Sequence, residues 1–490
     1  MTAPMDYGKV TPQVIDELKK ALGEDSVVTD EETLRPFASD YTEDLVFMPD
    51  VAVLPRTTEE VQAMCRIATK HRIPLTPRAG GTGLSGGALP VLGGILFSCH
   101  RMNRILEIDR ENLVGVVEPG VITQVFQEEV EKVGLFYPPD PASRGSCTLG
   151  GNVAENAGGP RAVKYGVTKD YVLGIEAVLP DGRLIQTGGK LYKDVTGYNL
   201  TQLMVGSEGT LAIFTKLYMK LIPWPPHRKV LLAPFNSFEA AAKAVVNVFT
   251  KGVQPSACEL MEKDAVDCAV EQLGKNWPHA DAAAHVLLEA DGHSMERVDE
   301  EAMLIGEACM EAGAEDVLLA EDDRRMAELW SLRRSIGEAV KSINIYKEED
   351  TTVPRSKIPE LILGVKEIAN RYGLMTICYG HAGDGNIHCN IIKTVDDEAW
   401  KNVLPVAIRE IFELTNSLGG QVSGEHGIGW VQREFLPITQ GAAEIALMRK
   451  IKDQFDPLGI LNPAKIFPEG PVPPPEQEGT EPGMDDIPAP

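Results

Sequence analysis

Residues 77–88 read PRAGGTGLSGGA, a loop in which glycine recurs at short spacing. Backbone N–H groups of such a loop can point inward and bind a phosphate, and glycine lets the chain approach it closely. The segment does not fit the G-x-G-x-x-G dinucleotide fingerprint cleanly: Gly81, Gly83 and Gly86 have its spacing, but no acidic residue stands in the required context about 20 residues further on. It also lacks the lysine of a P-loop. It therefore predicts a pyrophosphate site of a different architecture, with a plain surface loop as the alternative.

Helix and strand patterns alternate on both sides of this loop. A helix ending near His71 and a strand at 73–78 precede it, while 95–99 and 113–120 are strand-like and 121–134 is helical. This alternation indicates an α/β arrangement of the first part of the chain.

Residues 138–160, PPDPASRGSCTLGGNVAENAGGP, are rich in Gly, Asn and Pro and have few apolar anchors. Such a stretch is either disordered or wrapped around a ligand. The flanking strand patterns and the hairpin turn at 181–182 favour the second interpretation.

The segment WPPH at 224–227 predicts a joint between domains, because regular helical patterns separated by strand-like pieces follow it. These patterns indicate a second, α+β domain. The predicted limits are 1–225 for the first domain, 226–430 for the second and 431–468 for a C-terminal segment. The tail 469–490 is Pro-rich and acidic, and we expect it to be disordered.

Composition excludes several classes of partner. The 490 residues include 72 acidic and 47 basic side chains, a net charge of −25. A field of this sign repels nucleic acid and anionic lipid. No apolar run approaches the roughly 18–20 residues of a membrane helix, and no secretory or transit signal is visible. We therefore expect a cytoplasmic protein that reaches a membrane only through a partner.

The eight cysteines never form a C-x-x-C pair. An iron–sulfur cluster or a structural zinc site is not expected from this spacing. Cysteines scattered through a cytosolic chain mostly serve as small, buried apolar residues.

Two motifs, GHAGDGNIHCN at 380–390 and SGEHGIG at 423–429, place histidine and carboxylate between glycines. A hairpin turn in the first motif would bring His381 and His388 together, and the second motif offers Glu425. Two histidines and a carboxylate, with open positions left over, form a metal site able to hold a substrate. A set of hydrogen-bonded core histidines is the alternative.

Three segments in combination carry a family resemblance: 77–88, 138–159 and VGSEGTLAI at 205–213. Together they resemble the FAD domain of the vanillyl-alcohol oxidase and para-cresol methylhydroxylase superfamily. The similar branch holds the large flavin subunit of glycolate oxidase, FAD-linked D-lactate dehydrogenase and D-2-hydroxyglutarate dehydrogenase. The resemblance covers roughly 15–468. It implies an α+β fold: a two-subdomain FAD-binding domain, a cap domain with a ferredoxin-like sheet, and a C-terminal return to the FAD domain.

The resemblance also implies how FAD is held. It implies a pyrophosphate grip by Arg78, Gly80, Gly81, Thr82, Gly83, Leu84, Ser85 and Gly86. It implies contacts to the isoalloxazine and ribityl from Asp140, Pro141, Ser143, Thr148, Gly151, Asn152, Asn156, Gly158 and Gly159. It places Glu208, Gly209 and Ile213 near the adenine-ribose side, and Asn462 in the returning segment. Covalent relatives carry a histidine where this sequence has Thr82, so we expect non-covalent FAD.

By the same resemblance, His381, His388 and Glu425 match the ligands of one divalent metal, with zinc, manganese or iron all compatible. Asn390 and His426 match residues that contact substrate, with His426 as the base. The helix at 328–339 supplies Arg333, which aligns with the arginine that binds the substrate carboxylate. Solvated helix arginines are the alternative for that position.

The chain departs from the 2-hydroxyglutarate enzymes at two places. Gly337 stands where they have a threonine that helps hold the distal end of the substrate, and Lys347 is surrounded by Glu348 and Glu349. A dicarboxylate is therefore disfavoured. The sequence predicts a dehydrogenase of a small D-2-hydroxy acid, D-lactate or glycolate, with hydride transfer to flavin N5.

The sequence leaves three alternative functions open. They are D-2-hydroxyglutarate dehydrogenase, a flavin transferase of the alkyl-glycerone-phosphate synthase kind, and a non-catalytic FAD subunit. The resemblance implies a separate electron acceptor, such as an iron–sulfur subunit, an electron-transferring flavoprotein or a quinone. The substrate would be a small 2-hydroxy acid.

Overall fold

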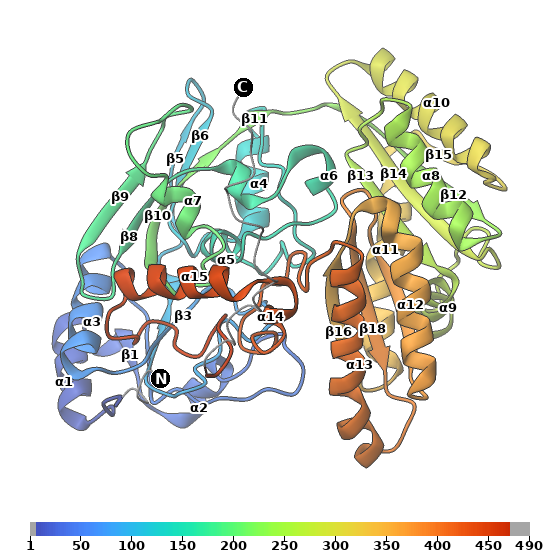
Figure 1. Ribbon diagram of the computed structural model, residues 1–490. Helices are drawn as coiled ribbons and strands as arrows, with labels where there is room; N and C mark the ends of the chain where they lie inside the picture. The colour runs from blue at the N-terminus through green and yellow to red at the C-terminus, as the bar shows by residue number, and fades with distance from the viewer. Residues whose placement is uncertain (1–5, 471–490) are drawn as a thin grey trace, which may run out of the picture.

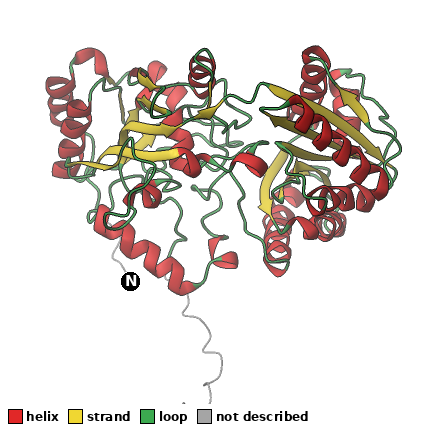
Figure 2. Cartoon of the chain, turned by 90° about the horizontal axis from the view of Figure 1, so that it is seen from above, coloured by secondary structure: helices red, strands yellow, loops and turns green. Residues whose placement is uncertain are grey.

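The computed structural model describes residues 6–470, which form two lobes joined by crossing segments (Figures 1 and 2). The first lobe comprises 6–226 together with 431–470, and the second lobe comprises 227–430. The predicted disorder of the tail concerns residues that lie almost entirely outside the described part. Within 6–470, no helix combines the length and apolar character needed to cross a bilayer.

The first lobe contains two sheets, with strand orders β1-β2-β4-β3 and β5-β6-β10-β8-β9, and the small pair β11-β7. Its elements are α1 (Pro12–Leu22), β1 (Val27–Val28), α2 (Glu31–Leu34), β2 (Val51–Val53), α3 (Thr58–His71), β3 (Leu75–Arg78), β4 (Ile95–Ser98), β5 (Ile105–Asp109), β6 (Val114–Val117), α4 (Thr123–Glu131), β7 (Leu135–Phe136), α5 (Leu149–Glu155), α6 (Ala162–Tyr165), β8 (Val172–Val178), β9 (Leu184–Gly188), α7 (Leu200–Met204), β10 (Ile213–Lys220) and β11 (Ile222–Pro223). Short 3₁₀ turns lie at Glu24–Ser26, Arg35–Phe37, Cys99–Arg101 and Thr168–Tyr171.

Helix α3 shows how the first sheet is covered. The Thr57 side chain accepts a hydrogen bond from the Glu60 N–H and so begins the helix. Its apolar face packs Val61 and Met64, both fully buried, into the core beneath β3 and β4. These two strands are parallel, and the glycine-rich loop leaves β3 at its carboxyl end. In an α/β sheet, ligands bind at that edge.

The second lobe is one seven-stranded antiparallel sheet in the order β15-β12-β14-β13-β17-β18-β16. Its elements are β12 (His227–Phe235), α8 (Phe238–Thr250), β13 (Ala257–Glu262), α9 (Lys263–Leu273), β14 (Ala284–Gly292), α10 (Met295–Ala312), β15 (Leu318–Ala320), α11 (Asp323–Ile343), β16 (Tyr346–Thr352), a 3₁₀ turn (Arg355–Lys357), α12 (Ile358–Arg371), β17 (Met375–His381), β18 (Asn386–Ile392) and α13 (Asp397–Ser417). The α+β class expected from the sequence is confirmed.

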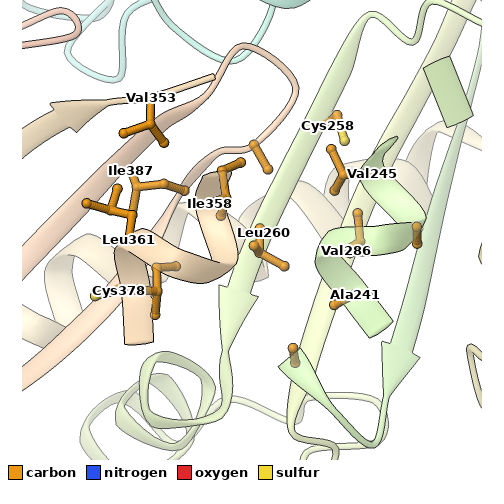
Figure 3. Close-up of a cluster of buried hydrophobic side chains, with 14 of the residues drawn as sticks. Ala241, Val245, Cys258, Leu260, Val286, Val353, Ile358, Leu361, Cys378 and Ile387 are labelled. Atoms are coloured by element: carbon orange, nitrogen blue, oxygen red, sulfur yellow. The ribbon is translucent and has the colours of Figure 1, made fainter. Parts of the chain in front are cut away.

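Because successive side chains of a strand point to opposite faces, one face of this sheet forms an apolar core and the other carries the histidines of the first motif. On one face, Cys258, Leu260 and Ile387 pack with residues of α8, α10, α12 and α13 (Figure 3). The opposite face packs against α9 and α11. Along β17 and β18, His381 and His388 belong to this second face, so the sequence alternation itself places both imidazoles together.

The chain returns to the first lobe at its end, through α14 (Leu436–Thr439) and α15 (Ala442–Phe455) (Figure 1). Leu75 of β3 donates its N–H to the Ile460 carbonyl at 2.8 Å, and its carbonyl accepts from the Asn462 N–H at 2.7 Å. The last described segment thus extends the sheet beside the glycine-rich loop. The domain limits 1–225, 226–430 and 431–468 stay our proposal.

Candidate active site

A cavity of about 610 Å³ lies between the two lobes. From the first lobe it is lined by most of the residues predicted to hold FAD: Arg78, Gly80, Gly81, Thr82, Gly83, Leu84, Asp140, Pro141, Ser143, Thr148, Gly151, Asn152, Gly158, Glu208, Gly209 and Ile213. From the second lobe it is lined by Glu259, Trp330, Arg333, Arg334, Gly337, Glu338, Lys341, Glu348, Tyr379, His381, His388, Glu425 and His426. One cavity therefore joins the two predicted clusters.

Two glycines of the first lobe lie where an added side chain would collide with neighbouring backbone. A Cβ at Gly80 would come 2.8 Å from the Ser146 carbonyl oxygen, and one at Gly159 would come 2.6 Å from the Asp140 carbonyl oxygen. Gly159 also has a φ of +132°, a region that favours glycine. The backbone segments that hold these residues therefore approach each other closely beside the cavity. This arrangement fits the pyrophosphate and ribityl of a flavin dinucleotide.

Five predicted FAD residues do not line the cavity: Ser85, Gly86, Asn156, Gly159 and Asn462. Two of them make hydrogen bonds within the protein instead. The Asn156 amide oxygen accepts from the Lys169 N–H, and the Asn462 amide donates to the Gly87 and Glu208 carbonyls. Sequence reasoning could not separate residues that build the walls from residues that face the cavity.

Ser85 ties the glycine-rich loop to the segment after Glu425. Its hydroxyl donates to the His426 carbonyl at 2.9 Å, and its carbonyl accepts from the Trp430 N–H at 2.9 Å. The Glu208 carboxylate makes a parallel connection, because it accepts from the Ile428 and Gly429 N–H groups. The loop that bears His426 is therefore attached to the first lobe at two points.

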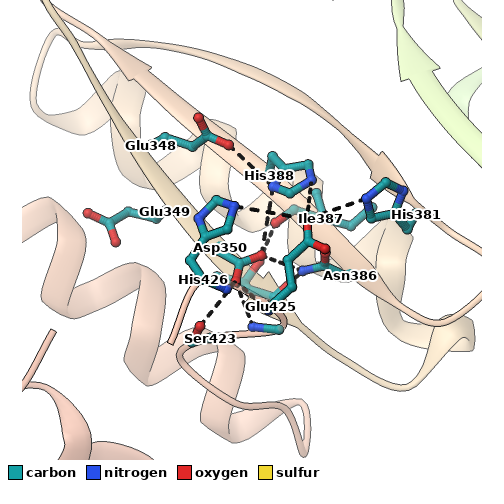
Figure 4. A network of polar contacts seen from close by, with 12 residues as sticks. Glu348, Glu349, Asp350, His381, Asn386, Ile387, His388, Ser423, Glu425 and His426 are labelled. Carbon is teal, nitrogen blue, oxygen red and sulfur yellow. Dashed lines mark hydrogen bonds and ion pairs between the residues drawn. The ribbon is translucent and has the colours of Figure 1, made fainter. Parts of the chain in front are cut away.

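The β17–β18 hairpin brings the two motif histidines together as predicted (Figure 4). Nε2 of His381 lies 3.5 Å from Glu425 Oε1, and Nε2 of His388 lies 3.6 Å from the same oxygen. The three donor atoms lie within 4.8 Å of one another. Two imidazole nitrogens and one carboxylate at this spacing suit a borderline divalent cation with positions left for substrate.

The far side of each imidazole faces a carboxylate. Nδ1 of His381 lies 2.8 Å from Glu259 Oε1, with hydrogen-bond geometry. Nδ1 of His388 lies 3.3 Å from Glu348 Oε1, an ion-pair distance without hydrogen-bond geometry. A carboxylate at Nδ1 places the proton there and leaves the Nε2 lone pair free, which is the tautomer a metal needs.

Asp350 of β16 holds the loop that carries Glu425 and His426 (Figure 4). Its Oδ2 accepts from three consecutive backbone N–H groups, those of Gly424, Glu425 and His426, at 2.9, 2.7 and 2.8 Å. Burial alone would raise the pKa of Asp350, but nearby His426 and His388 outweigh it and hold that pKa well below its usual range. The turn geometry of the second motif therefore rests on a charged side chain from another strand.

The pKa shifts within the cluster follow its charges. Burial alone would raise the pKa of Glu425, but His381 and His388 lower it to about 2. Burial opposes protonation of His426, but Asp350 and Glu348 raise its pKa above the ordinary value. His426 stacks on His388 with ring centroids 5.4 Å apart, so it lies beside the donor cluster.

Arg333 lies on α11, which packs against the sheet face that carries His381 and His388, and its side chain lines the cavity. Its side chain is 9% exposed, and one terminal nitrogen lies 2.7 Å from Glu259 Oε2. The guanidinium carbon lies 5.0 Å from the centre of the Tyr379 ring, and Nε has no protein partner. Arg333 lines the cavity, and a buried guanidinium that still has an unpaired N–H suits a substrate carboxylate.

One sequence expectation in this region needs correction. Asn390 shares a strand face with His388, as predicted, but it does not line the cavity; its amide donates to the Ile377 carbonyl at 3.3 Å. Lys347, which the sequence did not assign to the site, does not line the cavity and pairs with Glu43 at 3.0 Å. Strand alternation puts its neighbour Glu348 at the cavity wall instead.

Sequence reasoning missed Glu259 and Asp350. Glu259 lies in a mostly apolar strand, whereas Asp350 follows Glu348 and Glu349 in a polar one. Glu259 is fully buried inside the otherwise apolar run ACELM, and Asp350 is 3% exposed. For Glu259, a lone acidic residue in an apolar run was the available signal, because a buried carboxylate needs a partner. Asp350 had no such signal, since it is one of three consecutive acidic residues.

Comparisons with known proteins agree with this geometry. Residues 49–188 match the family described as FAD binding domain, and residues 224–466 match FAD linked oxidases, C-terminal domain. The chain is 39% identical to the glycolate oxidase subunit GlcD of Bacillus subtilis, over 94% of this chain and 97% of the relative. It is 36% identical to a D-lactate dehydrogenase of Anaerostipes hadrus, over 94% and 98% of the two chains. It is 34% identical to a D-2-hydroxyglutarate dehydrogenase of Stutzerimonas stutzeri, over 93% and 99%.

Solved structures show the same fold at low identity. A 4-ethylphenol oxidase from Gulosibacter chungangensis superposes with a TM-score of 0.77 at 21% identity, covering 95% of this chain and 99% of that one. A p-cresol methylhydroxylase gives 0.76 at 17% identity, covering 93% and 97%. The predicted architecture of an FAD-binding domain with a cap is thereby confirmed.

A dinucleotide-sized cavity walled by glycine loops on one lobe and by polar chemistry on the other defines a flavin-dependent oxidoreductase. The chain belongs to the family of FAD-linked oxidases, as the resemblance predicted.

Proposed function

We propose that the protein oxidises a small D-2-hydroxy acid, D-lactate or glycolate, to the 2-oxo acid, using FAD and one divalent metal. The observation that supports this proposal is the meeting of three features in one cavity: the FAD walls, the His381–His388–Glu425 donor set and Arg333. The relatives named as D-lactate dehydrogenase and glycolate oxidase subunit agree with this substrate class.

His381, His388 and Glu425 would hold the metal, because their free donor atoms converge and their backbones come from a rigid hairpin and an anchored loop. A divalent metal bound there would polarise the substrate hydroxyl and lower its pKa, as it does for bound water. Zinc, manganese and iron all suit this donor set.

The chain's own residues supply binding and proton transfer. Arg333 binds the substrate carboxylate and so orients the carbon that is oxidised. His426 takes the hydroxyl proton as the general base, since it lies beside the donor set without belonging to it. FAD would accept the hydride at flavin N5, and the protein aligns substrate carbon and flavin.

The glycine-lined walls would hold FAD without a covalent bond, because Thr82 and its neighbours in the loop offer no histidine or cysteine. Reduced flavin then needs a separate acceptor. We propose an iron–sulfur subunit, an electron-transferring flavoprotein or a quinone, in the cytoplasm or at a membrane that the protein reaches through this partner.

Substrate size follows from the far wall of the cavity. Gly337 offers no side chain that could hold the distal end of a longer substrate. The Glu348 carboxylate, which also lines the cavity, would repel a second carboxylate on the substrate. D-2-hydroxyglutarate is the second candidate, because Arg334 and Lys341 also line this wall.

The test is a substrate panel with D-lactate, L-lactate, glycolate and D-2-hydroxyglutarate, with an artificial dye as acceptor. We expect turnover with D-lactate or glycolate and its loss in a His426→Ala variant that keeps its flavin. Turnover only with D-2-hydroxyglutarate would replace the proposed substrate. A His426→Ala variant as active as the parent would contradict the mechanism and favour a transferase or scaffold role.

A further inference from the structure

Glu259 lies between the two parts of the site that touch substrate and metal. Its carboxylate is fully buried, with one oxygen 2.8 Å from His381 Nδ1 and the other 2.7 Å from the Arg333 guanidinium. The proposed function uses His381 and Arg333 and leaves Glu259 without a role. These two residues come from β17 and α11, which are far apart in sequence, and Glu259 comes from a third element, β13.

The sheet itself places Glu259 there. In the β13–β17 ladder, Leu260 pairs with Gly380 and Met261 with Tyr379. Continuing this antiparallel register sets Glu259 opposite His381, on the face covered by α11. Its neighbour Leu260 points into the dry core on the other face (Figure 3).

Burial makes the arrangement costly unless both partners are present. A carboxylate without water needs charged or hydrogen-bonding partners, and Glu259 has an imidazole and a guanidinium. In return, the Glu259 carboxylate accepts the proton-bearing Nδ1 of His381 as a hydrogen-bond donor and so fixes the His381 tautomer. Nε2 of His381 then becomes a better metal ligand. Its negative charge also offsets the Arg333 cation, which would otherwise repel a divalent cation bound nearby.

We propose that Glu259 is a positioning residue that couples metal binding at His381 to substrate-carboxylate binding at Arg333. The inference rests on the proposed function. It adds that one buried carboxylate sets the affinity for two different ligands. Within residues 6–470, His388 has no equivalent partner, since Glu348 approaches its Nδ1 without hydrogen-bond geometry.

The experiment compares Glu259→Gln with Glu262→Gln in the flavin-loaded full chain. Glu262 is a matched control: it lies on the same strand, is 4% exposed, and pairs with Lys366 at 2.9 Å, but it faces away from the site. The metal-free proteins are titrated with zinc alone against a chromophoric chelator. Separately, with zinc saturating, pyruvate is titrated as the 2-oxo acid product, followed by the flavin absorbance.

We expect Glu259→Gln to weaken zinc binding by about 10- to 100-fold, the range seen for carboxylates behind metal-bound histidines. Pyruvate binding should weaken as well, because the guanidinium loses the partner that holds it. Glu262→Gln should lower the melting temperature and leave both affinities unchanged. Glu259→Asp, which keeps the charge, should recover part of each affinity, which a merely structural role would not predict.

Zinc and pyruvate affinities of Glu259→Gln equal to the parent's would overturn the inference. A loss of zinc affinity alone would overturn the coupling to Arg333. If Glu259→Gln does not fold, Glu259→Asp against Glu262→Asp is judged by the same criteria. A parent protein that binds no zinc, manganese or iron would instead contradict the proposed function, so the two failures are distinguishable.

Discussion

Arg333 is the residue whose chemistry bears most directly on substrate binding. Its buried guanidinium uses one nitrogen for Glu259 and leaves Nε unpaired at the cavity wall. Lysine keeps the charge but lacks the planar fork. We expect Arg333→Lys to raise KM for the hydroxy acid by about 10-fold or more, with kcat changed less. Steady-state assays check this against Arg324→Lys, an exposed position on the same helix. Equal KM values in both variants would remove Arg333 from the substrate site.

Thr82 at the cavity wall predicts how the flavin is attached. A threonine hydroxyl does not form the histidyl bond that covalent relatives carry at this position. We expect acid precipitation of the protein to release all of its FAD, measured as flavin absorbance in the supernatant. A yellow pellet would show a covalent bond to another residue.

Among individual residues, those within recognisable sequence motifs could be predicted. Those that tertiary packing brings to the site were missed. His381, His388 and Glu425 stand in glycine-flanked motifs, so their clustering could be predicted. Glu259 is 122 residues from His381 in sequence, and its apolar surroundings indicate that it needs a partner without indicating which residue that partner is. Only the register of β13 against β17 brings the two together.

The loop after β18 and α13 is the element on which His426 depends. Gly429 has a φ of +52°, and a Cβ there would lie 2.2 Å from the Ser85 carbonyl oxygen. We expect Gly429→Ala to displace the loop and lower turnover by about 10- to 100-fold, because small displacements of catalytic groups have effects of this size.

The matched control is Gly419→Ala. Gly419 also has a positive φ, +78°, but its added Cβ would meet nothing within 4 Å. Both variants carry backbone strain, so both should lose some stability. Only Gly429→Ala should lose turnover relative to bound flavin. Equal turnover in the two variants would contradict the view that the Ser85 contact positions His426.

Elements with a strong local signal were predicted correctly, whereas the loops' contacts were not. The hairpin at β17–β18 follows from its Gly-Asp-Gly-Asn turn, and the α3 helix from its cap. The attachment of the His426 loop to Ser85 and Glu208 joins positions more than 200 residues apart. Such contacts depend on how the lobes meet, which periodicity does not encode.

At the scale of the whole molecule, the C-terminal segment buries a lysine under the glycine-rich loop. Lys465 is 2% exposed and donates to the Leu89 carbonyl at 2.7 Å. Burial lowers the pKa of Lys465 from 10.5 to about 7, although Glu208 and Asp40 pull it upward and Arg433 adds to the lowering. The folded state therefore binds this proton less tightly than the unfolded state does.

The sign of the pH effect follows directly. Between pH 7 and pH 10.5 the unfolded chain holds more of this proton, so the free energy of unfolding rises with pH, and below pH 7 the penalty is constant. We expect the parent to gain about 2 kcal/mol over Lys465→Met between pH 7 and pH 9. Denaturant unfolding at several pH values measures this difference. A difference independent of pH would show that Lys465 is not perturbed by burial.

The two lobes enclose one cavity between the walls proposed to hold FAD and the side chains proposed to bind metal and substrate. In the proposed reaction, a metal-bound hydroxy acid reduces FAD. The most direct measurement mixes the purified protein with D-lactate or glycolate without oxygen and follows the oxidised-flavin absorbance, before and after chelation. We expect bleaching that chelation abolishes and that added zinc, manganese or iron restores. Bleaching unaffected by complete metal removal, or no bleaching with FAD and metal both present, would contradict the proposed reaction.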